Sequence, residues 1–86
     1  MPHNFFRYGT TCLGHLEQIT NKNNYRLINT YARNDAEKNI AVLIKAKPPS
    51  NAQQIEVECI YRDEKLNLIR ADNKNLELKQ TLYLDN

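Results

Sequence analysis

Apolar residues recur with helical spacing in the segment that runs from residue 10 to residue 21. Cys12, Leu16 and Ile19 lie at positions i, i+4 and i+7, and this spacing places them on one face of a helix. Either of the two threonines at the start of the segment can cap the helix, because a threonine hydroxyl accepts a hydrogen bond from an unpaired backbone N–H. The pattern predicts a short helix over residues 10–21.

After residue 24, apolar and polar residues alternate with a period of two, which is typical of strands that have one covered face. Short polar stretches rich in Asn interrupt this alternation. They indicate turns, because Asn adopts the left-handed backbone conformation that tight turns need. The predicted strands are residues 25–33, 39–47, 54–62, 66–71 and 76–84.

The predicted strands follow one another without a helical segment between them, so we expect them to pair antiparallel through short connections. The helix is the other amphipathic element and is expected to cover one face of the sheet. The sequence therefore predicts an α+β fold, with a short N-terminal helix packed on a four- to five-stranded antiparallel meander. This arrangement is similar to a cystatin-like roll in architecture only, and no motif points to a particular family. The 86 residues fit one domain, residues 1–86.

The apolar stripe of the helix and the covered face of the sheet together form the expected core. In a chain of this length the core is thin, so each large apolar side chain contributes a sizeable share of the stability. The predicted core residues are Leu16, Ile19, Val42, Ile44, Val57, Cys59, Leu68, Leu78 and Leu82.

The two cysteines are expected to face each other, Cys12 on the helix and Cys59 on the covered face of the third strand. In a reducing cytoplasm they are two buried thiols, which is the interpretation we favour, and in an oxidising compartment they can form a disulfide. Cys12 and His15 have the spacing of half a zinc site. A structural zinc site needs four ligands, and no second close pair supplies the rest. We therefore predict no metal and no other cofactor.

The usual groups of a catalytic site are missing from the sequence. Ser50 is the single serine and follows two prolines in a loop, and no glycine-rich loop is present to hold a phosphate. Nucleophilic catalysis needs an activated side chain beside an oriented base. We therefore expect a protein that is not an enzyme and has no catalytic residue.

Neither a membrane span nor a signal peptide is expected. The longest apolar run, residues 40–44, falls far short of the roughly 18 residues of a membrane span, and the N-terminus lacks a basic region followed by an apolar stretch. If Met1 is the native start, the predicted location is the cytoplasm. If Met1 is not the native start, a leader peptide that has been removed is the alternative.

The formal net charge is +2, which is too small to indicate nucleic acid as the main partner. Residues 1–47 carry a net charge of +4 and residues 48–86 carry −2. Aromatic and basic residues adjoin in the N-terminal half, and single-strand binders combine such residues for base stacking and phosphate contact. The alternative function is therefore single-stranded nucleic-acid binding. Its candidate residues are Arg7, Arg26, Arg33 and Tyr31.

Four predicted strands each carry one large apolar residue that faces away from the helix: Leu43, Ile60, Ile69 and Tyr83. A contiguous exposed apolar patch marks protein–protein contacts, although β-propensity alone also places such residues on a solvated face. We expect a small protein-binding module of the inhibitor, immunity-protein or adaptor type. It acts through a sheet face or an edge strand, and its partner is another protein or a second copy of the chain.

Overall fold

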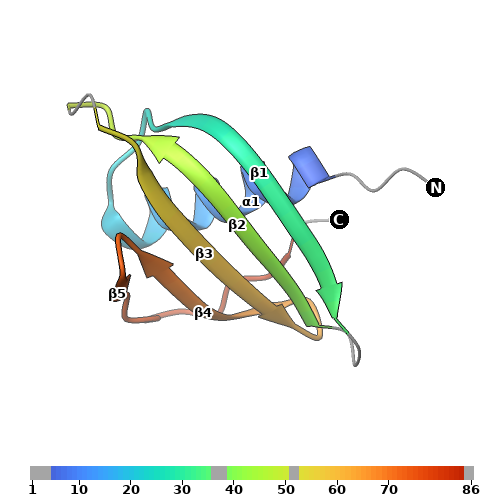
Figure 1. Cartoon of the computed structure of the whole chain (residues 1–86). Helices are drawn as coiled ribbons and strands as arrows, with labels where there is room; N and C mark the ends of the chain where they lie inside the picture. Colours follow the sequence, from blue (N-terminus) through green and yellow to red (C-terminus); the bar gives the residue numbers. More distant parts are fainter. Residues whose placement is uncertain (1–4, 36–38, 51–52, 85–86) are drawn as a thin grey trace.

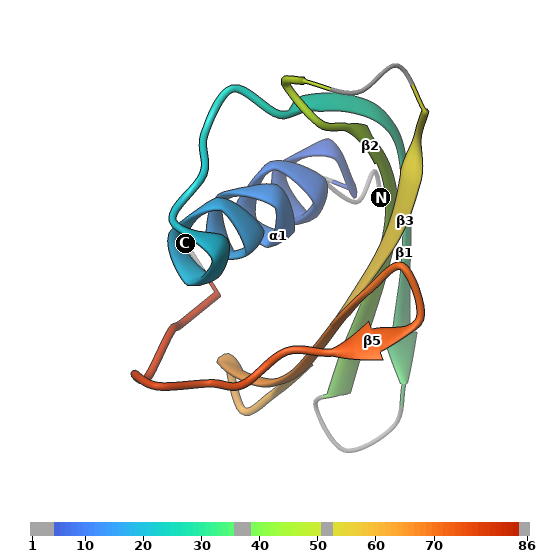
Figure 2. The same ribbon diagram turned by 90° about the vertical axis from the view of Figure 1, so that its left-hand side faces the viewer.

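The computed structural model describes residues 5–35, 39–50 and 53–84, which contain one helix and one antiparallel sheet with the strand order β1-β2-β3-β4-β5. The helix lies across one face of the sheet (Figure 1), and the sheet curves around it (Figure 2). This arrangement confirms the predicted α+β fold. None of the helices in the described residues has the length and apolar character that crossing a membrane requires. The elements are α1 (Phe5–Thr20), β1 (Arg26–Asp35), β2 (Asn39–Lys47), β3 (Ile55–Arg62), β4 (Lys65–Ala71) and β5 (Lys74–Asn75).

Helix α1 begins at Phe5, well before the predicted start at residue 10. The hydroxyl of Thr10 donates a hydrogen bond to the carbonyl oxygen of Arg7 at 2.9 Å within the helix, so the prediction of a capping threonine is wrong. No helix-breaking residue lies between Phe5 and Thr10 other than Gly9, and Gly9 is needed for packing. A Cβ atom at Gly9 would overlap Oγ1 of Thr30, so its absence lets α1 approach β1 closely. The helix ends next to Asn21, whose φ of 57° is typical of a residue that terminates a helix.

The first four predicted strands are present with small differences at their ends, but the prediction of a fifth strand over residues 76–84 is wrong. β5 contains Lys74–Asn75 alone, and the chain then runs back toward α1 (Figure 2). This C-terminal segment meets the sheet again at an isolated bridge between Tyr83 and Lys65. The backbone N–H of Leu66 donates to the carbonyl oxygen of Leu82 at 2.8 Å, which buries Leu82 and Leu84 against the core. The alternation that predicted a strand instead reflects a segment that closes the side of the core.

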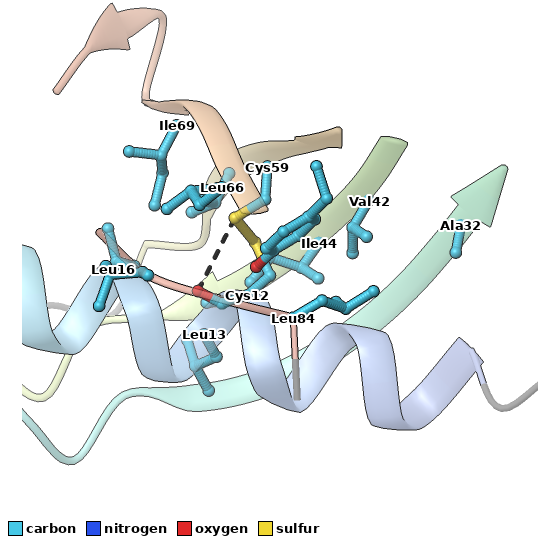
Figure 3. Packing of buried hydrophobic residues seen from close by; sticks show 14 residues of the cluster. Cys12, Leu13, Leu16, Ala32, Val42, Ile44, Cys59, Leu66, Ile69 and Leu84 are labelled. Atoms are coloured by element: carbon cyan, nitrogen blue, oxygen red, sulfur yellow. Dashed lines mark hydrogen bonds between the residues drawn. A yellow bond between two sulfur atoms is a disulfide. The ribbon is translucent and has the colours of Figure 1, made fainter. Parts of the chain in front are cut away.

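The core fills the space between α1 and the inner face of the sheet, which is the face that contacts the helix (Figure 3). Six of the nine predicted core residues are buried there, and Ile19 and Leu78 are partly buried and pack against them. Leu68 is the exception, because the register of β4 places it on the opposite face. The six buried residues are Leu16, Val42, Ile44, Val57, Cys59 and Leu82.

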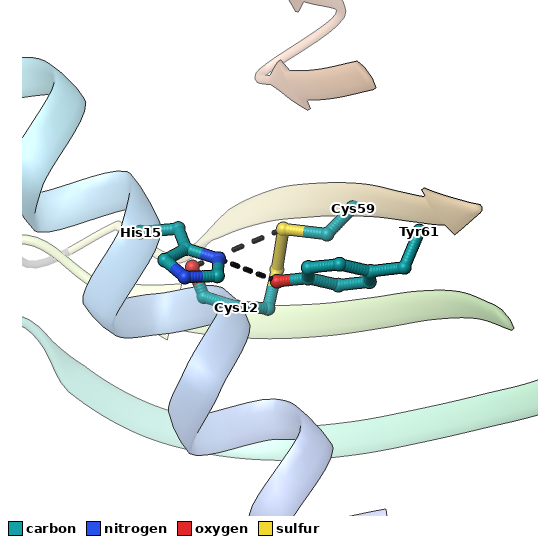
Figure 4. Close-up of a disulfide and its surroundings, with 4 residues drawn as sticks. All are labelled: Cys12, His15, Cys59 and Tyr61. Carbon is teal, nitrogen blue, oxygen red and sulfur yellow. Dashed lines mark hydrogen bonds between the residues drawn. A yellow bond between two sulfur atoms is a disulfide. The ribbon is translucent and has the colours of Figure 1, made fainter. Parts of the chain in front are cut away.

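Cys12 and Cys59 meet in the core, as predicted, and form a disulfide with a Cα–Cα distance of 5.9 Å (Figure 4). The interpretation that favoured two free thiols is therefore wrong for this structure. The bond joins α1 to β3 across a sequence separation of 47 residues. Beside it, Nδ1 of His15 lies within hydrogen-bonding distance of the Tyr61 hydroxyl, at 2.7 Å. Burial raises the pKa of Tyr61 above its ordinary value, so this hydroxyl stays protonated at neutral pH.

Candidate functional site

One edge of the sheet is covered by another segment of the chain, and the other edge carries a bulge at one end. On the β1 edge, the register shifts between Leu27 and Asn29, and the side-chain oxygen of Asn29 accepts a hydrogen bond from the N–H of Thr30 at 2.9 Å. On the β4 edge, the C-terminal segment covers the strand through the bridge between Lys65 and Tyr83. Bulges and covering segments are common means of preventing edge-to-edge association. An edge strand is therefore a poor candidate for the binding site, and the outer face, which points away from α1, is the better one.

Apolar side chains from four strands adjoin at the centre of the outer face. Tyr31 of β1 is opposite Leu43 of β2, and their exposed fractions are 60% and 43%. In the next row, Ala41 of β2 is opposite Ile60 of β3, which is opposite Leu68 of β4. Directly opposed residues in antiparallel strands have side chains in contact range on the same face. We call these five residues, Tyr31, Ala41, Leu43, Ile60 and Leu68, the apolar band.

The apolar band differs from the predicted patch because Ile69 faces inward. The register shifts beside Ile60 and Tyr61, so that Leu68 is opposite Ile60 on the outer face and Ile69 is opposite Cys59 on the inner face. Ile69 is 0% exposed. The prediction that Ile69 faces outward is therefore wrong, and Leu68 occupies the outward position. A strict period of two cannot reveal this bulge, since one extra residue in a strand reverses the facing of those that follow.

Tyr83 is 62% exposed but lies beyond the apolar band, at the edge of the sheet opposite Lys65. It lines a surface cavity of about 350 Å³ together with Arg62, Asp63, Lys65 and Asn67. Charged and polar residues therefore surround Tyr83, and they separate it from the band. Of the four predicted patch residues, Leu43 and Ile60 belong to the band and the other two do not.

Three of the four residues proposed for nucleic-acid binding lie together. Arg26, Tyr31 and Arg33 occupy exposed positions on β1, and the register places them on the outer face. Arg7 belongs to α1, on the other side of the sheet (Figure 1). The structure therefore brings the β1 residues to the apolar band and leaves Arg7 apart.

Basic side chains gather on the outer face. Its strand positions with described side chains hold seven basic residues against Glu56 and Glu58. The sequence has a charge asymmetry between the two halves of the chain, whereas the fold concentrates positive charge on one face. Such a surface attracts and orients a negatively charged partner. The seven basic residues are Arg26, Arg33, Lys45, Lys47, Arg62, Lys65 and Arg70.

One part of this positive charge is neutralised within the face. Nη1 of Arg70 lies 3.8 Å from Oε1 of Glu58, and Nε of Arg70 donates to Oδ1 of Asn75 at 3.1 Å. Leu43, Glu56, Glu58, Arg70 and Asn73 line a shallow cavity of about 180 Å³ beside the apolar band. This volume is below the usual range for small-molecule sites. The arrangement suits contact with a macromolecule better than enclosure of a small ligand.

No group of three metal-binding side chains converges in the parts of the chain that the structure describes. Cys12, one half of the hypothetical zinc pair, is bonded to Cys59 and has no thiolate to offer. His15, the other half, contacts Tyr61 in the core.

No family model matches the chain, and no match was found among curated proteins or among solved structures.

Proposed function

We propose that this chain is a non-enzymatic protein-binding module that contacts its partner through the outer face of the sheet. The observation that supports this proposal is the apolar band, which joins side chains from four strands at the centre of an otherwise charged surface. An apolar centre with a polar rim is the usual anatomy of a protein–protein interface. In this proposal the module is of the inhibitor, immunity-protein or adaptor type.

Substitution of the two most exposed band residues tests the proposal. Tyr31→Ser with Leu43→Ser removes apolar contact area while leaving the core intact, because neither side chain is buried. The matched control is Phe6→Ser with Ile28→Ser, since these residues are also exposed, at 69% and 39%, and line a surface cavity outside the band.

The partner is first captured by cross-linking in cells of the source organism, identified by mass spectrometry and purified. Titration calorimetry with the purified partner is then expected to show affinity lower by about tenfold or more for the band variant, because truncation of contact residues at the centre of an interface typically costs over 1 kcal/mol. The control variant is expected to bind like the wild type. Equal affinity of the band variant and the wild type contradicts the proposal.

A second candidate function is single-stranded nucleic-acid binding by the same face. The seven basic residues that share the outer face with Tyr31 favour it, since such proteins combine a cationic surface with an aromatic stacking platform. Titration of the chain with oligothymidylate at several salt concentrations tests this function. Phosphate contacts give an affinity that falls steeply with salt, whereas no measurable binding at low salt excludes the function.

The buried disulfide bears on where the module acts. Disulfides persist in oxidising compartments and are rare in the cytosol. We therefore propose that the chain works in an oxidising compartment, in place of the cytoplasmic location expected for a native start at Met1. Alkylation of free thiols in intact cells, followed by mass spectrometry of Cys12 and Cys59, tests this. Both cysteines are expected to resist alkylation until a reductant is added, and ready alkylation without it contradicts the proposal.

A further inference from the structure

Two pairs of basic residues are directly opposed on the outer face. Arg26 of β1 is opposite Lys47 of β2, and Arg62 of β3 is opposite Lys65 of β4. Like charges at directly opposed strand positions destabilise a sheet. Nε of Arg62 also donates a hydrogen bond to Oδ1 of Asn39 at 3.4 Å, but the two cations that face each other in each pair still oppose local stability. Conflicts of this kind are expected at functional sites.

The two pairs lie on opposite sides of the apolar band. β2 ends at Lys47, and β3, which is antiparallel to β2, ends at Arg62, so these two residues lie at opposite ends of the sheet. The band residues Leu43 and Ile60 lie between the two ends. The band is thus bounded by Arg26 and Lys47 at one end and by Arg62 and Lys65 at the other. A surface that complements this face needs an apolar centre with negative charge on both sides.

We infer that the partner of the outer face is a protein surface on which carboxylates flank an apolar centre. This inference rests on the protein-binding function proposed above and names the chemistry of the partner. Carboxylates at the rim neutralise the opposed basic pairs and steer the encounter, while the apolar band supplies the contact area at the centre.

Two other occupants fit the face less well. A second copy of the chain, joined about a two-fold axis, would place the same excess of basic residues on both sides of the interface. A single-stranded nucleic acid stacks its bases on aromatic rings, and the apolar band contains one aromatic residue, Tyr31, among aliphatic ones. Both occupants are outcomes that the experiment can reveal.

The first part of the test uses charge reversal. Arg26→Glu with Arg62→Glu turns each like-charged pair into an ion pair with Lys47 or Lys65, so we expect the thermal midpoint of unfolding to rise. The matched control, Lys22→Glu with Lys74→Glu, changes the net charge equally at exposed positions off the outer face, since Lys74 is opposite Ala71, which faces inward. If the charge-reversal variant is more stable than the wild type but binds less tightly, Arg26 and Arg62 are retained for binding. A purely structural role does not predict that stability rises while affinity falls.

The second part uses random short peptides displayed on phage and selected on the wild-type chain. We expect the selected peptides to be enriched in Asp and Glu beside apolar residues. Their affinity is expected to fall about tenfold or more for the charge-reversal variant, to be lost with Tyr31→Ser and Leu43→Ser, and to stay unchanged for the lysine control.

Different failures have different meanings. Selected peptides that depend on Tyr31 and Leu43, but lack acidic enrichment or keep their affinity for the charge-reversal variant, overturn the acidic partner and leave the protein-binding function standing. Peptides that bind regardless of Tyr31 and Leu43 overturn both. If oligothymidylate binds this face more tightly than the acidic peptides do, the inference is overturned in favour of nucleic acid. If the wild type self-associates in sedimentation and the Tyr31 and Leu43 variant does not, the inference is overturned in favour of a second copy.

Discussion

Reduction of the Cys12–Cys59 disulfide is expected to remove a large part of the stability of this domain. The bond joins residues that are 47 positions apart. In the chain-entropy treatment of cross-links, closure of a loop of that length stabilises the folded state by about 4 kcal/mol, because it restricts the unfolded chain. The whole free energy of unfolding of a domain of this length is roughly 4–13 kcal/mol. The reduced protein is therefore expected to be only marginally stable.

Reduction isolates the effect of the cross-link better than substitution does. Both sulfur atoms stay in the core, so no cavity forms. The Cys59 sulfur lies 3.8 Å from the carbonyl oxygen of Cys12, the contact drawn as a dashed line in Figure 4. A disulfide sulfur carries no hydrogen, but the reduced thiol can donate to this carbonyl. The thiol form thus has a partner in place, and the lost stability is that of the cross-link itself.

Urea unfolding followed by circular dichroism, with and without a thiol reductant, measures this effect. We expect the unfolding midpoint to fall and the dependence of the free energy on urea to steepen, because the reduced unfolded chain exposes more surface. Cys12→Ala with Cys59→Ala serves as the control that reductant should leave unchanged. A loss below about 1 kcal/mol on reduction would contradict this prediction, since the unfolded chain would then gain little freedom from cleavage of the bond.

Two further predictions concern packing and pH. Gly9→Ala is expected to destabilise the fold by about 1–3 kcal/mol, because its Cβ would overlap the Thr30 side chain, whereas Gly14→Ala in open space should stabilise it by up to about 1 kcal/mol. Thermal unfolding of both variants checks this, and equal shifts in the two would contradict it. Because burial raises the folded-state pKa of Tyr61, the stability due to its neutral hydroxyl is complete below about pH 10, where the unfolded tyrosine ionises, and is lost as the pH rises further. As the pH rises above about 10, the urea midpoint should decline more for the wild type than for Tyr61→Phe. Equal declines in the two proteins would contradict the role given to the Tyr61 hydroxyl.

The spacing of apolar residues was sufficient to determine the general architecture. A helical stripe followed by segments with a period of two leaves few arrangements for a short chain, because the helix must cover the one apolar face that the meander provides. The same reasoning placed Cys12 and Cys59 on facing surfaces, so their contact was predictable. The oxidation state of the two cysteines was not predictable, since two buried thiols and a disulfide give the same sequence pattern.

Side-chain facing within a strand depended on the tertiary structure. Leu66, Leu68 and Ile69 are all apolar, and a period of two assigns Leu66 and Leu68 to the same face. Pairing with β3 instead introduces a bulge that turns Leu66 and Ile69 inward and Leu68 outward. A sequence signal for the bulge is Arg70, because a strict period of two from Leu66 and Leu68 would turn this charged residue inward, and the bulge turns it outward.

The candidate site was the part that the sequence determined least. The alternation of apolar and polar residues over residues 76–84 is the same for a strand and for a segment that closes the core. The side chains that line the outer face come from strands far apart in the sequence. The net charge of +2 did not indicate that seven basic residues share that face. Net charge is a sum over the whole chain, whereas the field at a surface depends on where the charges lie in the folded structure. The sequence determined which elements form, through local periodicity. The tertiary structure decided which residues share a surface, because the register between strands depends on contacts that no local pattern contains.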